Sequence, residues 1–418
     1  MAAVRQVIGI VNLSGSIIMG CRLVAMPLGT FKKESRMLRA NNFLKFWSIK
    51  MIILLILLTL GSYSLQAQEF IQIPSFDKVI IEGRLNIPSN GYKNTIVIDF
   101  PSSGPQTYEN MRKIGRNTVF KYHDYFQNEF AKRGIAYFSC STRYTLPDST
   151  NPPYYDKVEK EKFFSYTPLV KVKDLEEIIN FLKKDERLAS SKFIILGFSE
   201  GALLATLAAE RMKVSVDALF LAGAPADDVY TTMLWQLSGA SSMINFRKFF
   251  DANKDDIIQK SEYENADPRA IARVGGKKFE ELDMQEDSVL TAEDFRIILE
   301  PNRKQILDAI ELDDNEWIWS NYFRVGTQWI KEHRNIEPNS TRILKLDLPV
   351  YLFHGSDDAN CRVEGIIQIH KNAKELNKQN IHVFIFPDHD HSLEFISWVV
   401  RKTLPEGLKT LFEEIEKF

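Results

Sequence analysis

A run of four bulky apolar residues leads directly into a Gly-Phe-Ser-Glu-Gly turn, and this stretch constrains the fold more than any other. The run occupies residues 193–196, Ser199 stands at the centre of the turn, and Ala and Leu follow it. A continuous apolar run is typical of a strand buried on both faces, whereas Ala and Leu favour a helix. Gly197 and Gly201 leave room where side chains would collide. The pattern predicts a strand, a sharp turn that carries Ser199, and a helix.

The Gly-x-Ser-x-Gly pentapeptide alone does not establish a catalytic serine, because an ordinary Gly/Ser turn that opens a helix has the same pattern. A helix that begins just after Ser199 would direct its free N–H groups and its positive dipole end toward an oxyanion formed there. The decision between the two interpretations depends on partner residues elsewhere in the chain.

Segments typical of strands alternate with segments typical of helices after residue 67. We expect strands at 70–73, 79–87, 95–100, 135–140, 193–196, 217–222, 348–353 and 381–386. We expect helices at 118–132, 169–182, from the turn to about residue 212, 363–377 and 391–416. This alternation predicts an α/β protein with a mostly parallel sheet that helices cover on both faces.

The alternation stops near residue 228 and resumes near residue 343. The chain between these points is helical in pattern and rich in charged and aromatic residues, which predicts a helical cap inserted between two strands. We therefore expect four segments: a leader at 1–67, the first part of the α/β core at 68–229, the cap at 230–342, and the second part of the core at 343–418.

The leader has the composition of an export signal. Residues 51–60 are apolar, lysines precede them, and small residues lead to Ala67. These features predict a secretory signal peptide cleaved after Ala67, and hence a periplasmic or secreted protein. An uncleaved membrane anchor is the alternative. Residues 1–36 do not fit a signal peptide, so Met37 and Met51 are alternative start residues.

Acidic and histidine residues follow the last two expected strands. The first of these loops contains His354, Gly355, Asp357 and Asp358, and the second contains Asp388, His389, Asp390 and His391. Parallel strands place their active sites at their carboxyl ends, so these residues are expected near Ser199. The chain order is therefore a serine, an acid and a histidine.

With these motifs the chain resembles the α/β-hydrolase superfamily from about residue 70 to residue 418, apart from the cap. The Ser-Ser-Gly-Pro stretch at 102–105 also resembles a bacterial secreted branch of serine esterases, which has Gly-Ser-Gly-Pro there. The resemblance implies that Ser199 is the nucleophile, that a histidine is its base, and that an acid orients the histidine. The family spacing Gly-x-x-Asp favours Asp358 over Asp357, and the flanking residues favour His391 over His389.

The resemblance also implies an oxyanion hole formed by two backbone N–H groups. One comes from Glu200 and the other from the loop after the strand at 95–100. Members of the family commonly have His-Gly-x-Gly in that loop, whereas this chain has Pro-Ser-Ser-Gly-Pro at 101–105. Because Pro105 has no N–H, we expect Ser103 to be the second donor, with Gly104 as the alternative.

The cap contains a sequence that matches the calcium loop of an EF-hand at residues 251–262. The predicted ligands are the side chains of Asp251, Asn253, Asp255 and Glu262 and the carbonyl of Ile257. Position six holds Asp256, where Gly is expected. A weaker second copy begins at Asp283, and we expect the eighth residues of the two loops, Ile258 and Leu290, to pair. The alternative is an acidic helix-turn-helix without an ion.

The net charge of −2 over 418 residues gives no basic excess of the kind that a nucleic-acid-binding protein shows. We expect a small-molecule ester or acyl substrate, no cofactor for catalysis, a structural Ca²⁺ in the cap, and membrane contact only through an uncleaved leader. The predicted function is a secreted serine hydrolase that cleaves a carboxylic ester through an acyl-enzyme. The alternatives are a prolyl-oligopeptidase-like peptidase that cleaves an amide, and a non-catalytic calcium-binding module on a hydrolase scaffold.

Overall fold

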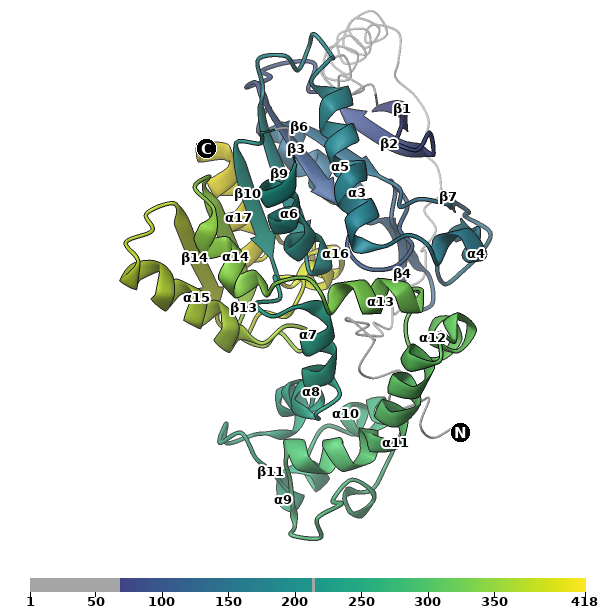
Figure 1. The fold of residues 1–418 in the computed structure, drawn as a ribbon. Helices are drawn as coiled ribbons and strands as arrows, with labels where there is room; N and C mark the ends of the chain where they lie inside the picture. Colours follow the sequence, from purple (N-terminus) through teal and green to yellow (C-terminus); the bar gives the residue numbers. More distant parts are fainter. Residues whose placement is uncertain (1–67, 213–214) are drawn as a thin grey trace, which may run out of the picture. The chain divides into compact units, whose positions relative to one another are not determined.

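A computed structural model describes residues 68–212 and 215–418, so the predicted leader lies outside the described residues. An eight-stranded sheet runs in the order β1-β2-β6-β3-β9-β10-β13-β14 (Figure 1). The strands are β1 Gln68–Pro74, β2 Ile80–Asn86, β3 Thr95–Phe100, β6 Ala136–Cys140, β9 Lys192–Phe198, β10 Ala218–Ala222, β13 Val350–Gly355 and β14 Ile381–Phe386. β1 and β2 are antiparallel to their neighbours and the other pairs are parallel. This topology confirms the predicted α/β-hydrolase fold.

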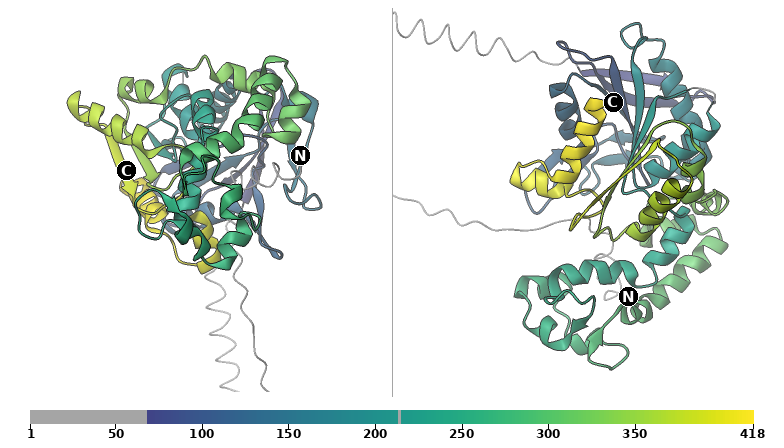
Figure 2. Two further views of the ribbon diagram at one scale, coloured as in Figure 1. Left: turned by 90° about the horizontal axis from the view of Figure 1, so that it is seen from below. Right: turned by 90° about the vertical axis from the view of Figure 1, so that its left-hand side faces the viewer.

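Helices cover both faces of the sheet (Figure 2). Ile96 and Ile98 of β3 belong to a hydrophobic core that includes residues of α5, α6 and α15, whereas Val97 belongs to a second core with residues of α3, α16 and α17. Successive residues of a strand point to opposite faces, so these two cores lie on opposite sides of the sheet. The helices are α3 Tyr122–Lys132, α5 Pro168–Leu182, α6 Glu200–Arg211, α15 Val363–Glu375, α16 Phe395–Arg401 and α17 Glu406–Lys417.

Two helix expectations are wrong. Residues 118–132 do not form one helix, because β5 (Thr118–Lys121) pairs with β4 (Met111–Ile114) before α3 begins. The β-branched and aromatic residues at 118–120 favour a strand, and Gly115 in the left-handed region allows the turn of the hairpin. The helix expected at 391–416 is instead α16 and α17. It breaks because Lys402 has φ 59° and Pro405 caps the second helix.

The cap lies between β10 and β13 and is built almost entirely of helices. Its helices are α7 Val229–Gln236, α8 Ala240–Phe250, α9 Lys260–Glu264, α10 Pro268–Arg273, η1 Phe279–Glu281, α11 Ala292–Glu311, α12 Asn315–Asn321, α13 Thr327–His333 and α14 Asn339–Lys345. Apolar side chains of the cap form two cores, one around Phe246, Phe250 and Phe295, and one around Ile306, Ile318 and Trp329. The remaining short elements, in the first part of the core, are β7 Thr145–Pro147, β8 Asp156–Val158 and α4 Lys160–Phe163.

The two loops that resemble calcium loops pair with each other. β11 (Ile258–Gln259) and β12 (Val289–Leu290) are antiparallel, and Ile258 lies opposite Leu290. The expected pairing of the eighth loop residues is therefore confirmed. Both side chains are fully buried in the Phe246 core, so the pairing is part of the hydrophobic packing of the cap.

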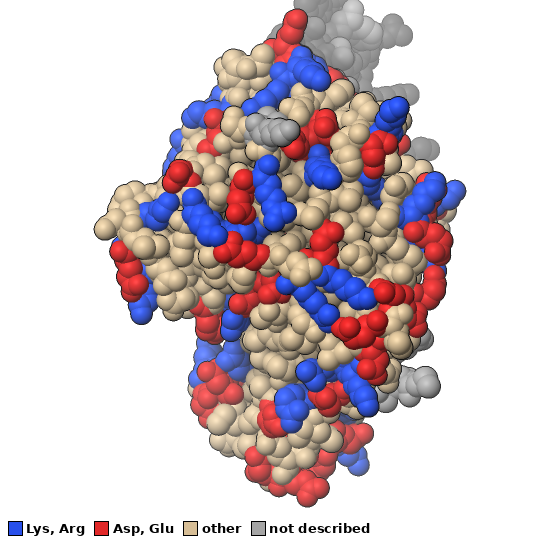
Figure 3. Space-filling view, viewed as in Figure 1, with Lys and Arg blue, Asp and Glu red and all other residues tan. Residues whose placement is uncertain are grey.

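The surface carries both signs of charge. Figure 3 shows Lys and Arg side chains interspersed with Asp and Glu side chains across one face of the molecule. Within residues 68–212 and 215–418, no helix combines the length and the apolar character needed to cross a membrane.

Adjacent residues of α8 offer a test of this packing. Phe250→Ala should lower the free energy of unfolding by about 3–5 kcal/mol, because it opens a cavity beside Tyr263, on which Phe250 stacks. Phe249 is 45% exposed, so Phe249→Ala should cost less than about 1 kcal/mol. Urea unfolding of the two variants measures both values, and equal losses would contradict the described orientation of α8.

Candidate active site

The turn at Ser199 is held by close contacts between backbones. Ser199 has φ 56° and ψ −125°, a strained conformation for a residue with a side chain. A Cβ atom on Gly197 would lie 2.6 Å from the Gly201 carbonyl oxygen, and one on Gly201 would lie 2.6 Å from the Phe100 carbonyl oxygen. Glycine is therefore required at both positions, and the first turn of α6 lies directly against the end of β3.

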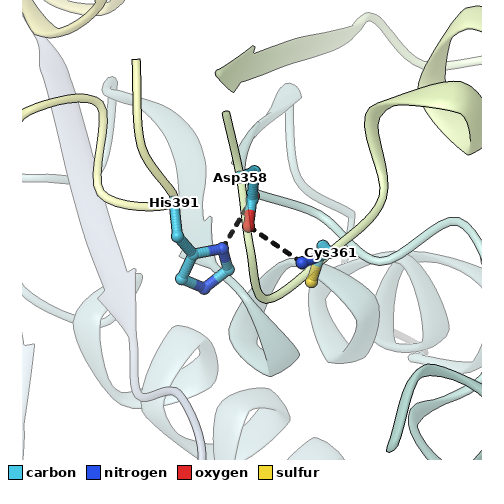
Figure 4. A group of neighbouring side chains, drawn as sticks. All are labelled: Asp358, Cys361 and His391. Atoms are coloured by element: carbon cyan, nitrogen blue, oxygen red, sulfur yellow. Dashed lines mark hydrogen bonds and ion pairs between the residues drawn. The ribbon is translucent and has the colours of Figure 1, made fainter. Parts of the chain in front are cut away.

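Asp358 and His391 form a direct hydrogen bond at the carboxyl ends of β13 and β14 (Figure 4). The His391 Nδ1 atom lies 2.8 Å from the Asp358 Oδ2 atom. Because a carboxylate only accepts hydrogen bonds, Nδ1 must carry the proton, and Nε2 is left free to accept one. The other carboxylate oxygen of Asp358 accepts the N–H groups of Asn360 and Cys361, each at 2.8 Å. The acid is thus fixed in one orientation.

The two partners shift each other's pKa values. Burial lowers the pKa of His391, but the charge of Asp358 and its hydrogen bond raise it by more, so the pKa lies above the ordinary 6.5. Burial raises the pKa of Asp358, but the attraction to His391 and His354 lowers it by more, so the pKa lies below 3.8. Asp358 is therefore a carboxylate at neutral pH.

Ser199 and His391 lie at the ends of neighbouring strands. The Ser199 N–H donates to the Ala222 carbonyl at the end of β10, at 3.0 Å. The next residue, Gly223, lies against His391, because a Cβ atom there would be 2.9 Å from both Nδ1 and Cε1 of the imidazole ring. The structure therefore brings the three predicted catalytic residues to one edge of the sheet.

The side chains of Asp357 and His389, the alternative acid and base, contact groups other than each other and the Asp358–His391 pair. The Asp357 carboxylate accepts from the Ser356 hydroxyl at 3.3 Å and lies 3.7 Å from the Lys248 ammonium. His389 Nδ1 donates to the Pro387 carbonyl at 2.9 Å, and its Nε2 accepts the Gly407 N–H at 3.3 Å. Asp357 thus faces helix α8, and His389 links the loop after β14 to the start of α17.

His354 is a second histidine against the acid, and its contact with Asp358 was not expected from the sequence. Its Nε2 atom donates to the Cys361 carbonyl at 2.9 Å and lies 3.3 Å from the Asp358 Oδ2 atom. Burial lowers the pKa of His354 more than Asp358 raises it, so its pKa lies below 6.5. The only feature of the sequence that could have indicated this contact is the position of His354, at the end of a strand and four residues before Asp358.

Asp358, His391 and Cys361 also offer three ligand atoms within 4.8 Å of one another, the only such group of His, Cys, Asp and Glu in the described part of the chain. The donor chemistry does not favour a metal ion there. Both oxygens of Asp358 already accept hydrogen bonds. Burial raises the pKa of the Cys361 thiol well above its usual range, and nearby carboxylates raise it further. A protonated thiol is a poor ligand, so the donor set does not fit a metal ion.

The two predicted oxyanion donors flank the turn. Glu200 is the first residue of α6, and Ser103 lies in the loop after β3. Within the described residues, neither of these backbone N–H groups has a hydrogen-bond acceptor. The Glu200 side chain turns away from solvent and is 1% exposed, and it pairs with Lys171, Trp329 and His333. Nothing in the motif pointed to this buried pairing.

The loop at 251–262 folds around its own carboxylates. The Asp251 side chain accepts the N–H groups of residues 254, 255 and 256, and the Glu262 side chain accepts those of residues 252, 253 and 259. In the second loop, Asp283 accepts the N–H groups of residues 287 and 288, and Asp294 accepts those of residues 284, 285 and 291, which match the first loop except at position four. Positions four and six have positive φ in both loops. The weaker copy thus has the same conformation as the stronger one.

The Asp358–His391 pair can be tested by titration. We expect the pKa of His391 to lie above 6.5 and to fall in Asp358→Asn, which loses the negative charge. The stability linked to this proton is present below about pH 6.5 and is lost as the pH rises through the folded-state pKa. NMR of the imidazole protons measures the shift, with His370 on α15 as the control. An unchanged His391 pKa in Asp358→Asn would contradict the pairing.

No family model and no curated protein matches this sequence. Solved structures do resemble it. An esterase of Pyrococcus furiosus is 14% identical, with a TM-score of 0.42 over 82% of this chain and 91% of the esterase. An esterase from Exiguobacterium antarcticum is 14% identical, with a TM-score of 0.41 over 82% and 98%. An acylaminoacyl peptidase of Pyrococcus horikoshii is 14% identical, with a TM-score of 0.41 over 86% and 42%. The assignment of the α/β-hydrolase fold rests on the strand order described above.

Proposed function

We propose that this protein is a serine hydrolase that cleaves a carboxylic ester through Ser199, His391 and Asp358. The observation that carries the proposal is the hydrogen bond of 2.8 Å between His391 Nδ1 and Asp358 Oδ2. It fixes the imidazole tautomer that a general base requires, at the sheet edge where the strained turn presents Ser199.

In the first half of the reaction, the Ser199 hydroxyl attacks the ester carbonyl carbon and His391 Nε2 takes the hydroxyl proton. The carbonyl oxygen becomes an oxyanion, which the N–H groups of Glu200 and Ser103 stabilise. Asp358 stabilises the imidazolium that forms. When the tetrahedral intermediate collapses, His391 returns the proton to the leaving alcohol, and the acyl group stays on Ser199.

In the second half, a water molecule takes the place of the alcohol. His391 Nε2 removes a proton from the water as its oxygen attacks the acyl carbon. The second intermediate collapses with release of Ser199, which recovers its proton from His391, and the carboxylic acid leaves. The same residues thus act in both halves, with the imidazole alternating between base and acid.

Two other functions fit parts of the chain. A prolyl-oligopeptidase-like peptidase would use the same residues on an amide, and turnover of aryl esters against aminoacyl anilides separates the two activities. A non-catalytic calcium-binding module would have a dead site. The arrangement of Asp358 against His391 favours an enzyme over that module, because a relic has no need of an oriented base.

The cap is proposed to hold a structural Ca²⁺ in the loop at 251–262. The support comes from two paired loops that share one conformation, a feature that isolated acidic turns lack. The ligands would be the side chains of Asp251, Asn253, Asp255 and Glu262 and the carbonyl of Ile257. Each carboxylate offers about four lone-pair sites, so these side chains could bind the cation and still accept N–H groups.

Export is proposed as well, with cleavage after Ala67. The composition of residues 51–67 supports it, because lysines precede an apolar core that small residues follow up to Ala67.

The catalytic residues can be tested with a fluorophosphonate probe and aryl-ester turnover. Ser199→Ala should abolish labelling and leave a rate only about a thousandfold to ten-thousandfold above that in water. His391→Ala should lose nearly as much and Asp358→Asn less, because the first removes the base and the second only its orientation. His389→Ala is the matched control and should keep its activity. Activity in His391→Ala with loss in His389→Ala would contradict the assignment of the base.

Calcium should stabilise the folded wild-type protein by mass action and so raise its melting temperature. At a calcium concentration 100 times the dissociation constant, the free energy of unfolding should rise by about 2.7 kcal/mol. Glu262→Gln should lose this gain while Ser199 labelling stays intact, because the loop takes no part in the chemical step. Glu264→Gln, two residues along α9, makes the same change outside the loop and should keep the gain. Calorimetry that shows no calcium binding to the wild type would overturn the site.

Cleavage of the leader predicts that protein recovered from the periplasm or the medium starts at Gln68. Terminal sequencing after expression in a host with a secretory pathway measures this directly. Full-length protein in the membrane fraction would instead show that residues 51–60 act as an uncleaved anchor.

A further inference from the structure

A buried ion pair lies beside the turn that carries Ser199, and the reaction steps given above make no use of it. The Lys171 Nζ atom is 2.9 Å from the Glu200 Oε2 atom, and the two side chains are 2% and 1% exposed. A buried ion pair contributes little to stability when an apolar pair could replace it, so its presence suggests a different role. Burial alone would raise the pKa of Glu200, but Lys171 and His333 lower it to about 2, so the side chain is a carboxylate.

The second oxygen of the Glu200 carboxylate contacts the cap. Trp329 Nε1 donates to Glu200 Oε1 at 2.8 Å, and His333 Nε2 donates to the same oxygen at 3.0 Å. Both donors lie on α13, and both side chains are buried. The carboxylate is therefore held from two sides, by α5 through Lys171 and by α13.

Lys171 donates one further hydrogen bond, and it is to the loop after β3. Its Nζ atom donates to the Ser102 carbonyl at 2.9 Å. The Ser102 carbonyl and the Ser103 N–H belong to one planar peptide unit, in which they point in opposite directions. A cation on the carbonyl therefore fixes the direction of the N–H on the other side. It also polarises the peptide unit and makes the N–H a stronger donor.

We propose that Lys171 is a positioning residue for the oxyanion hole, which orients the Ser103 N–H through the Ser102 carbonyl while the Glu200 side chain holds Lys171 in place. The inference rests on the proposed serine hydrolase function. Glu200 would then support both oxyanion donors. Its backbone supplies one N–H, and its carboxylate holds Lys171, which orients the other N–H through the Ser102 carbonyl. This arrangement also makes α13 of the cap part of the support of the catalytic machinery.

The test compares variants that remove the ammonium with variants that keep it. Removing only one partner would leave a buried charge unpaired, so the main variant is Lys171→Met combined with Glu200→Gln, which is neutral at both positions. Lys171→Arg keeps the charge but places its donors differently. Lys173→Met makes the same substitution on the exposed side of α5 and is the matched control. Circular dichroism and thermal unfolding establish that each variant folds.

In p-nitrophenyl acetate turnover, the double variant should lose about 10- to 100-fold in kcat, somewhat less than the loss of an oxyanion donor outright. KM should stay within about threefold, because the oxyanion forms only in the transition state. Affinity for phenylboronic acid, whose adduct with Ser199 places an oxygen in the oxyanion hole, should fall with kcat. Lys171→Arg should fall between the double variant and the wild type, and Lys173→Met should match the wild type.

A folded double variant with kcat within about twofold of the wild type would overturn the proposal, as would a raised KM at unchanged kcat. If the double variant does not fold, Lys171→Arg decides: a lower kcat with lower boronate affinity supports the proposal, and an unchanged kcat overturns it. A wild-type protein that neither turns over the ester nor reacts with the phosphonate would overturn the hydrolase function itself. An active wild type with unaffected variants would overturn this inference alone.

Discussion

The close approach of three backbone segments at Ser199 is the constraint on which the rest of the site depends. β9 must turn into α6 within van der Waals contact of the end of β3, and this is possible only because residues 197 and 201 have no side chains. The Ser199 N–H also donates a hydrogen bond to the Ala222 carbonyl at the end of β10. Surrounding contacts thus hold a strained residue in one conformation, which keeps its hydroxyl at the sheet edge where Asp358 and His391 lie.

Near this turn, each buried carboxylate contacts several groups that compensate for the loss of solvent. Asp358 is buried with His391, His354 and two backbone N–H groups, and Glu200 is buried with Lys171 and two donors of α13. Each carboxylate has a full set of partners, so burial does not force it to take up a proton. The first set orients His391, the proposed base, and the second connects the cap to the loop that carries the proposed oxyanion donor.

The sequence predicted the parallel core well because its strands are continuous apolar runs, which few other structures can accommodate. The predicted helices were wrong where two local structural preferences competed. At 118–121 a hairpin replaced the start of a helix because the β-branched residues and Gly115 outweighed the apolar spacing, and at 402–405 a positive φ and a proline interrupted a helical pattern.

Within the site, Ser199, Asp358 and His391 could be named because each follows a strand in a recognisable motif. The contacts of Glu200 and Lys171 could not, because no local pattern shows that side chains 29 residues apart meet in the interior. The same holds for His333 and Trp329, which reach Glu200 from a separate segment of the chain. Long-range polar contacts of this kind are set by tertiary packing and leave no periodic signal.

In the proposed mechanism, Ser199 carries an acyl group during turnover. Rapid quenching of the protein with p-nitrophenyl acetate, followed by mass spectrometry of its peptides, tests this directly. We expect one acetyl group on the peptide that contains Ser199, formed in a burst and absent from Ser199→Ala. Ester turnover with the acetyl group on another residue, or with no acyl-enzyme and full activity in Ser199→Ala, would contradict it.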